Sequence, residues 1–209
     1  MGINILKKVL LITAIPLLFA ASCRKDGTRP CERAAYIFAV TSEWSPQREV
    51  YNVGDTIFLN SSFSKTLVDL TGNYNVDYSN SVGVGGNITT SVMDTITHSI
   101  IDGLSNFEII QIKGNISPIA NIPNAGKNIT YSEQANYIFN AGVVLKQKGL
   151  YQLAVTDLSS RGIVGKNCTN AGFGMTVTNT DKHLNLFQYA LGYAPDALLQ
   201  KSIYCFRVQ

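Results

Sequence analysis

The residue with the clearest chemical role is Cys23, a thiol that directly follows the small residues 20–22. An apolar stretch at 9–21 precedes the thiol, and two lysines at 7 and 8 precede that stretch. A basic start, a short apolar run and small residues at its end are typical of a secretory signal peptide. The run is too short for a permanent membrane helix, which needs about 20 apolar residues. We therefore predict export, with residues 1–22 as a signal peptide.

The same residues resemble the lipobox of bacterial lipoproteins, in which small residues precede a cysteine that becomes the acylated first residue. Here the box is Ala20, Ala21, Ser22 and Cys23, with Ala20 where a larger aliphatic residue is usual. The resemblance implies a diacylglycerol on the sulfur of Cys23 and an acyl chain such as palmitate on its nitrogen, and two or more chains anchor a protein stably. Ordinary cleavage after Ser22, with release of the protein, is the alternative, because Ala20 and Ser22 also satisfy the small-x-small rule.

Residues 23–33 are predicted to be a lipidated tether, because they contain Gly27, Pro30 and several charges. Lys25 and Asp26 resemble part of the charged motif that directs Bacteroidota lipoproteins to the cell surface. The resemblance implies attachment to the outer membrane, facing either the periplasm or the cell surface.

Acylation of Cys23 would leave Cys31, Cys168 and Cys205, so at most one intramolecular disulfide could form. By loop entropy, a Cys31–Cys168 bridge would stabilise the fold by about 5 kcal/mol and a Cys168–Cys205 bridge by about 4 kcal/mol. This difference is too small to decide between the two pairings. Cys31 and Cys168 lie in polar segments, whereas Cys205 lies in the apolar run 203–208. We therefore predict a disulfide between Cys31 and Cys168 and a buried, unreactive Cys205.

Catalytic and metal-binding patterns are weak in this sequence. Asp94, His98 and Asp102 are spaced by four residues, which places them on one stripe of a helix predicted over 93–104. A histidine between carboxylates could act as a general base or a metal ligand, but an exposed polar face explains the spacing better. With His183 as the only other histidine, we predict no metal site, no catalytic residues and no cofactor.

Charge excludes one class of partner. From Ala34 onward the chain has 11 basic and 12 acidic residues. Such a neutral body lacks the basic surface that nucleic-acid binding requires, so we predict no nucleic-acid partner.

Residues 71–90 are rich in Gly, Asn, Ser and Thr and are predicted to form the main loop of the body. Tyr74 and Tyr78 lie in this loop, where they could stack on a sugar or a peptide. The alternative is a hairpin loop whose tyrosines cover one end of the core.

The remaining chain alternates apolar and polar residues over short runs, which predicts a mainly β fold. We predict an immunoglobulin-like antiparallel sandwich over 34–209, treated as a single β-rich domain. Two segments, 51–55 (Tyr-Asn-Val-Gly-Asp) and 148–153 (Lys-Gly-Leu-Tyr-Gln-Leu), resemble strands of such sandwiches. Residues 137–145 and 150–155 are predicted to pair as a hairpin. Helices expected over 181–191 and 195–201 would form a short helical elaboration, with 157–209 as a candidate α+β extension.

These features favour a non-enzymatic, membrane-anchored module that binds a glycan, a peptide or an envelope protein through loops at one end of the sandwich. A hydrolase acting on an envelope or imported polymer is the first alternative, although neither a nucleophile motif nor a paired acid motif occurs in the sequence. A structural subunit of an envelope complex is the second.

Overall fold

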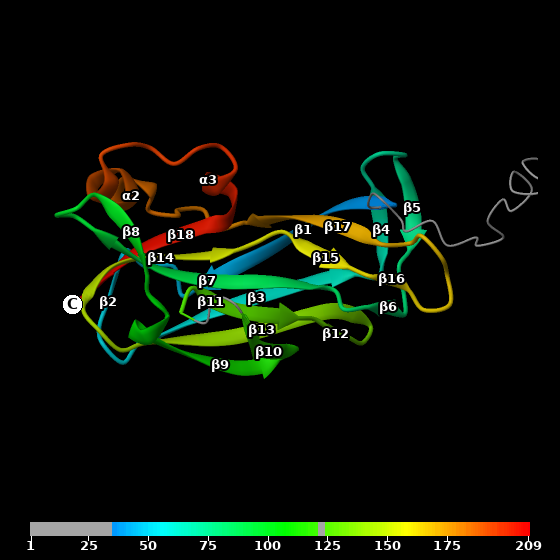
Figure 1. Ribbon diagram of the computed structural model, residues 1–209, viewed down its shortest axis with the longest axis horizontal. Coiled ribbons are helices and arrows are strands. Elements are labelled where there is room, and N and C mark those ends of the chain that lie inside the picture. The colour runs from blue at the N-terminus through cyan, green and yellow to red at the C-terminus, as the bar shows by residue number, and fades with distance from the viewer. Residues whose placement is uncertain (1–34, 121–123) are drawn as a thin grey trace, which may run out of the picture. The chain divides into compact units, whose positions relative to one another are not determined.

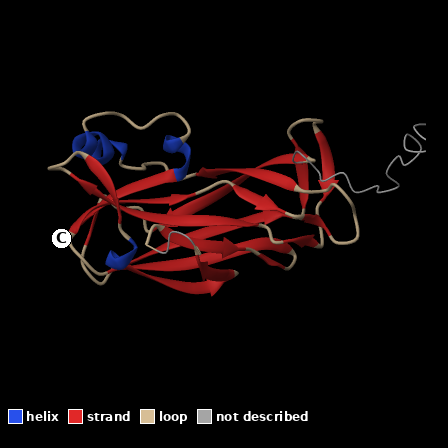
Figure 2. Cartoon of the chain, in the orientation of Figure 1, coloured by secondary structure: helices blue, strands red, loops and turns tan. Residues whose placement is uncertain are grey.

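The computed structural model describes residues 35–120 and 124–209. Most of them form strands in two packed layers, and two short helices cover part of one layer (Figures 1 and 2). This confirms the predicted mainly β sandwich with a helical elaboration near the C-terminus, although the strand pairs 36–42 with 171–177 and 50–51 with 207–208 are parallel rather than antiparallel. The signal peptide, Cys23, Cys31 and the tether lie outside the described residues.

The first sheet is organised around its long central strand, β7. Its members are β1 (Tyr36–Ser45), β2 (Val50–Tyr51), β7 (Gly85–Asp94), β8 (Ser99–Asp102), β10 (Asn115–Pro118), β11 (Gly126–Thr130), β14 (Gly149–Val155), β15 (Leu158–Ser160), β17 (Ala171–Val177) and β18 (Ile203–Val208). β14 and β15 follow one another along one edge of β7, and β11 and β8 occupy the other edge. Beyond β15 and β14 lie β17 and β18, which pair in parallel with β1 and β2, respectively.

The second sheet is organised around β13. It contains β3 (Thr56–Ser64), β9 (Phe107–Lys113), β12 (Ser132–Glu133), β13 (Asn136–Leu145) and the last residues of β1. β3 pairs with one edge of β13, whereas β9 and β12 pair with the other. A 3₁₀ turn at Leu104–Asn106 leads into β9.

The two sheets are joined at both sides of the sandwich. β1 pairs first with β17 and then with β3, so it crosses from one sheet to the other. On the opposite side, β9 continues into β10 through Gly114, which has φ = +85°. A Cβ at this glycine would lie 2.6 Å from both the Phe139 ring and the Thr130 carbonyl oxygen. Only glycine fits this corner, because backbone and ring close in on it and the φ value is left-handed.

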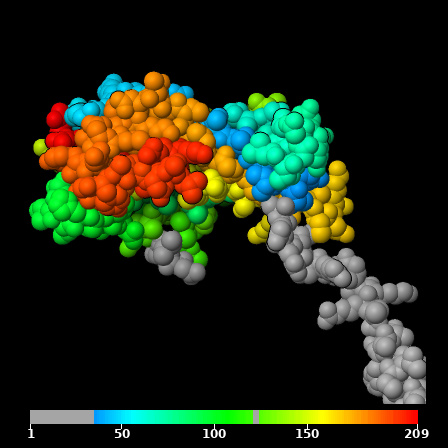
Figure 3. All heavy atoms as spheres, turned by 90° about the horizontal axis from the view of Figure 1, so that it is seen from above, coloured from blue at the N-terminus to red at the C-terminus, as the bar shows by residue number. Residues whose placement is uncertain are grey.

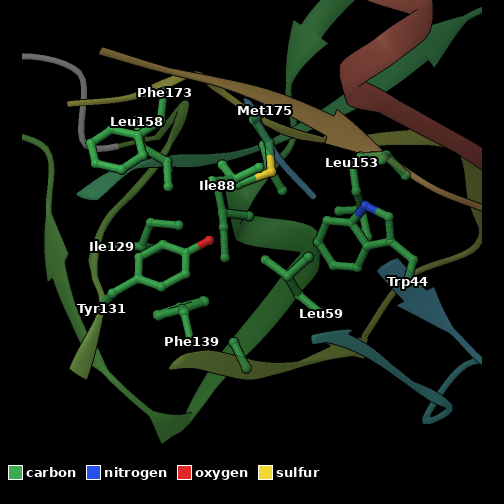
Figure 4. Close-up of a cluster of buried hydrophobic side chains, with 14 of the residues drawn as sticks. Trp44, Leu59, Ile88, Ile129, Tyr131, Phe139, Leu153, Leu158, Phe173 and Met175 are labelled. Carbon is green, nitrogen blue, oxygen red and sulfur yellow. The ribbon is translucent and has the colours of Figure 1, made fainter. Parts of the chain in front are cut away.

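The main core fills the space between the sheets, where alternate residues of each strand point inward. Trp44, Leu59, Phe139 and Leu153 are fully buried there, and Phe173 is 1% exposed (Figure 4). Burial of each such side chain contributes about 1.5–3 kcal/mol, which makes this core the main source of stability.

The helices lie in the connection between two strands, β17 and β18, that are on the same side of β7 in the first sheet. After β17 the chain leaves the sheet through α2 (Leu184–Leu191) and α3 (Leu199–Ser202), and it returns as β18. Leu186, Phe187 and Ala190 on α2 pack against Leu150 and Cys205, forming a second, smaller core on the outer face. Residues 157–209 are therefore not an appended extension, because they supply strands from within the sandwich.

Two small strand pairs lie at the end of the sandwich opposite to α2 (Figure 1). β4 (Thr66–Asp69) pairs with β5 (Tyr74–Asp77), and β6 (Ser81–Val82) pairs with β16 (Gly162–Ile163).

The predicted helix over 93–104 is wrong, because this segment is the hairpin between β7 and β8. The Asp94 carboxylate accepts the backbone N–H of Ile96 at 2.8 Å and of Thr97 at 3.3 Å, which closes the turn. Local side-chain bonds of this kind compete with helix formation, and the β-branched residues of the segment favour strands.

The predicted hairpin between 137–145 and 150–155 is also wrong, although both strands exist. β13 pairs only within the second sheet and β14 only within the first, so the connection crosses between the layers. A short polar link with Gly149 suits either arrangement. The two long buried strands find different neighbours only in the folded protein.

Candidate functional site

A groove of about 600 Å³ lies on the outer face of the first sheet, between the β4–β5 hairpin and α3. Figure 3 looks onto this face, with the orange and red atoms of the helical excursion on one side and the teal atoms of the hairpin on the other. β1 and β17 form its floor through Ile37, Ala39, Gly174 and Thr176. Three segments distant in sequence therefore build one recess.

The floor of the groove is low because β17 presents glycines where other strands present side chains. Gly172, Gly174 and Thr176 point outward, alternating with buried residues. A Cβ added at Gly174 would meet nothing closer than the Phe38 carbonyl oxygen at 3.8 Å, and one at Gly172 would meet Ile37 Cδ1 at 3.6 Å. Neither glycine has a left-handed φ value. The fold therefore has room for side chains at both positions.

Two other strand glycines, Gly85 and Gly126, differ because the fold excludes any side chain there. A Cβ at Gly85 would lie 2.1 Å from the Ile129 carbonyl oxygen, and one at Gly126 would lie 2.2 Å from that of Ile88. Glycine within a strand costs about 0.5–1 kcal/mol relative to alanine. Gly174 carries this cost without a packing reason, which is typical of positions where a ligand or another backbone approaches closely.

One wall of the groove is held by the buried carboxylate of Asp69. Its Oδ1 accepts the backbone N–H of Ile37 at 2.8 Å, and its Oδ2 accepts the hydroxyl of Thr71 and the N–H of Gly72. The N–H of Leu70 donates to the Ile37 carbonyl at 2.8 Å. These bonds, that of Thr71 foremost, lower the pKa of Asp69 below its usual value. They fix Leu70, which is 58% exposed, beside the floor.

The opposite wall is the start of α3. Asp196 Oδ1 accepts the N–H groups of Leu198 at 3.0 Å and Leu199 at 2.8 Å, so it closes the turn that leads into this short helix. Leu198 is 78% exposed. An aliphatic side chain so open to water beside an apolar floor is suited to contact with a ligand.

The polar lining of the groove consists of Thr156, Asp157, Thr176, Asp196, Lys201 and Ser202. Asp157, at the break between β14 and β15, accepts the N–H of Met175 through Oδ1 at 2.9 Å, and Lys201 lies on the α3 side. The exposed apolar side chains, Ile37, Leu70 and Leu198, are aliphatic. This lining suits an extended, mainly apolar segment better than a sugar ring, which binds best to aromatic faces.

The two tyrosines predicted to bind a ligand have different environments. Tyr78 is fully buried, donates its hydroxyl to the Thr169 carbonyl at 2.8 Å and packs against Phe38. Burial raises its pKa. Tyr78 therefore belongs to the core and cannot contact a ligand at the surface, whereas Tyr74 is 52% exposed on β5. Residues 71–90 include β5, β6 and part of β7, so the segment is not the long loop that its composition predicts.

The cysteines that the structure describes are Cys168 and Cys205. Cys168 is bonded in a disulfide, and its predicted partner Cys31 lies outside the described residues. Cys205 is free and fully buried, and its burial raises the pKa of the thiol to about 12. The prediction of a buried Cys205 is thus confirmed.

The two histidines lie away from the groove. His98 places its Nδ1 2.7 Å from the Ala190 carbonyl oxygen and so links the β7–β8 turn to α2. His183 is 8% exposed, with Nδ1 3.2 Å from a carboxylate oxygen of Asp181. Within residues 35–120 and 124–209, no group of three or more His, Cys, Asp or Glu side chains could hold a metal ion.

Sequence reasoning missed the groove, although one signal was present. The segment 171–177 alternates small outward residues with apolar inward ones, which marks a strand with an empty outer face. Nothing in the sequence shows that Leu70 and Leu198 stand on either side of it. In the part of the chain that the structure describes, no helix has the length and apolar character needed to span a bilayer.

Comparison with known proteins adds little. No family model and no curated protein matches the sequence. Two similar solved structures are of the second type II cohesin module from the cellulosomal adaptor ScaA scaffoldin of Acetivibrio cellulolyticus, one of them including a long C-terminal linker. They are 13% and 14% identical, with a TM-score of 0.30 in both cases, and the matches cover 57% of this chain and 76% and 72% of those chains. A TM-score of 0.30 is too low to carry an argument, so the fold class depends on the strands and registers of this chain.

Proposed function

We propose that the protein is an exported bacterial lipoprotein, anchored to the outer membrane through Cys23, whose body binds without catalysing a reaction. Its ligand is an extended apolar peptide segment of another envelope protein, and its binding site is the groove. The lipobox and signal peptide support the anchor, and the groove supports the binding role.

One observation carries the binding role. Gly174 leaves the groove open at a position where the fold tolerates a side chain, although a β-branched residue would suit the strand better. The aliphatic lining favours a peptide over a glycan, and the exported compartment makes an envelope protein its natural source.

The test is crosslinking on intact cells, followed by recovery of the protein through a C-terminal tag. Wild type is compared with Gly174→Val, which places a side chain on the groove floor, and with Gly142→Val, at a buried glycine of β13 in the second sheet. A Cβ at Gly142 would meet the Thr56 methyl group at 3.2 Å and the Phe58 ring at 3.6 Å, two side chains that can shift. We expect one defined envelope protein to be recovered with wild type and Gly142→Val and to be lost with Gly174→Val. Equal recovery with all three proteins would refute the groove as the binding site.

The anchor has its own test. Intact-mass measurement of the membrane-extracted protein should give the chain from Cys23 onward plus the mass of the lipid groups. A bare polypeptide beginning at Cys23 would show release after ordinary cleavage.

A further inference from the structure

A turn at the end of the sandwich carries an exposed valine between two cations. Val164 is 66% exposed, and its N–H donates to the Asn80 carbonyl at 3.0 Å. The turn closes through Gly165, with φ = +74°, and through the Lys166 N–H, which donates to the Ile163 carbonyl at 3.1 Å. Arg161 and Lys166 flank the valine, and neither forms an ion pair with a described residue.

This turn lies where the chain enters the body. The N–H groups of Ala35 and Tyr36 both donate to the Asn170 carbonyl, at 2.8 and 3.3 Å. Asn170 is two residues beyond Cys168, which is itself bonded in a disulfide. The first described residue and the valine turn therefore belong to the same end of the sandwich, opposite to α2 (Figure 1).

The length of chain before Ala35 limits how far this end can lie from an anchor at Cys23. Residues 24–34 separate the two positions. Eleven residues and the bonds that join them to their neighbours can span at most about 40 Å. A surface held so close experiences an effective concentration in the millimolar range, at which weak contacts with the membrane are populated.

The chemistry of the turn suits a lipid surface. An exposed aliphatic side chain can enter the boundary between headgroups and acyl chains, while neighbouring lysine and arginine side chains contact anionic headgroups. Val82, which is 42% exposed and lies opposite Gly162 in the β6–β16 pair, extends the apolar contact. Two acidic residues lie nearby. Glu133 is paired with Lys65 at 3.6 Å. The pKa of Asp77 is lowered, chiefly by the hydroxyl and the N–H of Ser79 and to a smaller extent by the charges of Lys166 and Lys65, so Asp77 offsets part of the positive charge of the turn.

We propose that the turn at 161–166 rests on the anionic membrane surface to which Cys23 is anchored, with Val164 inserted among the headgroups. The proposal depends on the lipid anchor proposed above. It orients the body, with α2 and the β7–β8 hairpin directed away from the membrane. The groove then lies along the side of the sandwich, within reach of neighbouring envelope proteins.

Tryptophan fluorescence can test this orientation. The only tryptophan, Trp44, is fully buried, so a second one introduced at the surface reports its own surroundings. Val164→Trp places the probe on the turn. Ile96→Trp is the matched control, because Ile96 is 87% exposed in the turn between β7 and β8, and β8 lies at the opposite end of the sandwich from β16 (Figure 1). The full-length lipidated proteins are reconstituted in vesicles of phosphatidylcholine and phosphatidylglycerol, with or without bromine-labelled acyl chains.

We expect the emission of Val164→Trp to shift to shorter wavelength and to lose most of its intensity to the brominated lipid, whereas Ile96→Trp stays unquenched. Adding Arg161→Glu and Lys166→Glu to Val164→Trp should restore its emission. Omission of phosphatidylglycerol should have the same effect.

Flotation of the same vesicles separates the two proposals. If the protein floats with the vesicles but the probe at 164 remains as exposed to water as the probe at 96, the anchor stands and the membrane-contact proposal is refuted. If the protein does not float, the anchor itself fails and the orientation fails with it.

Discussion

Two regions of the molecule use glycine for opposite reasons. At the corner where β9 turns into β10, Gly114 is enclosed by a ring and a carbonyl, and its φ value is left-handed. On the groove floor, Gly174 has an ordinary strand conformation and free space above it. The corner glycine is explained by the fold, whereas the floor glycine is explained only by what the groove must admit. A glycine that has both free space and an ordinary φ value therefore lacks the structural reason that explains the corner glycine.

The largest expected effect is at the corner. Gly114→Ala combines left-handed strain of about 1–2 kcal/mol with overpacking of about 1–3 kcal/mol, so we expect the free energy of unfolding to fall by about 2–5 kcal/mol. Urea denaturation followed by circular dichroism measures the change. A loss below about 1 kcal/mol would mean that the corner relaxes easily and that the comparison overstates its rigidity.

A smaller, local effect is expected at the groove wall. Asp69→Ala removes the acceptor for Ile37, Thr71 and Gly72, so Leu70 should lose its fixed position. Hydrogen exchange of the Ile37 and Gly72 amides should accelerate, while that of the β13 amides should remain unchanged. Uniform acceleration across the sandwich would indicate global destabilisation instead.

Acid should reproduce the Asp69→Ala effect in the wild type. The folded protein lowers the pKa of Asp69, so the stabilisation is present above the ordinary pKa of an aspartate and is lost as the pH falls through the lowered value. Exchange at Ile37 in acid should therefore approach that of Asp69→Ala, after correction for the intrinsic pH dependence of exchange. If hydrogen exchange at Ile37 stays equally slow in acid, the neutral carboxyl group of Asp69 is sufficient to hold the groove wall in place.

The groove floor should respond in the opposite sense to the corner. Gly174→Val adds a β-branched residue where space is free, so we expect stability to stay unchanged or to rise by up to about 1 kcal/mol. Recovery of the crosslinked partner should nevertheless be lost. If Gly174→Val strongly destabilised the protein, the fold would require this glycine as it requires Gly114. The argument for a binding role would then be lost.

The smallest effect concerns the packing of the helical excursion. Because burial raises the pKa of Cys205 to about 12, the folded protein at pH 8 should react with a thiol reagent only through opening of α2. The corresponding stability contribution is present below the ordinary thiol pKa of about 8.5 and is lost as the pH rises above it. Rapid labelling without denaturant would show that the excursion is loosely attached, and α3 would then be an unreliable wall for the groove.

Much of the fold was predictable from local patterns. β3, β9 and β18 coincide with stretches of the sequence that alternate apolar and polar residues or are rich in β-branched ones. The helix at 184–191 follows from the spacing of its apolar residues and from Gly192, which ends it in a left-handed conformation. Local energetics and tertiary packing agree at these positions.

The wrong predictions concern segments whose local sequence is compatible with more than one structure, so that tertiary packing decided between them. Apolar residues spaced for a helix at 93–104 pair across a hairpin, because the carboxylate of Asp94 closes a turn and β7 offers a free edge. Tyr78 lies in a polar, glycine-rich stretch, yet the core encloses it. Pairing partners and burial depend on residues far away in the chain, which no local pattern contains.

By itself, the sequence predicted the signal peptide and the lipobox, and it determined the near-neutral charge of the body and the β-rich class, because these depend on composition and on short-range order. Only the tertiary structure decided that β1 bridges two sheets, that β13 and β14 belong to different layers and that Leu70, Gly174 and Leu198 surround one groove. The physical reason is that strands are completed by partners distant in sequence. A recess built from three such segments exists only after the sheet has assembled.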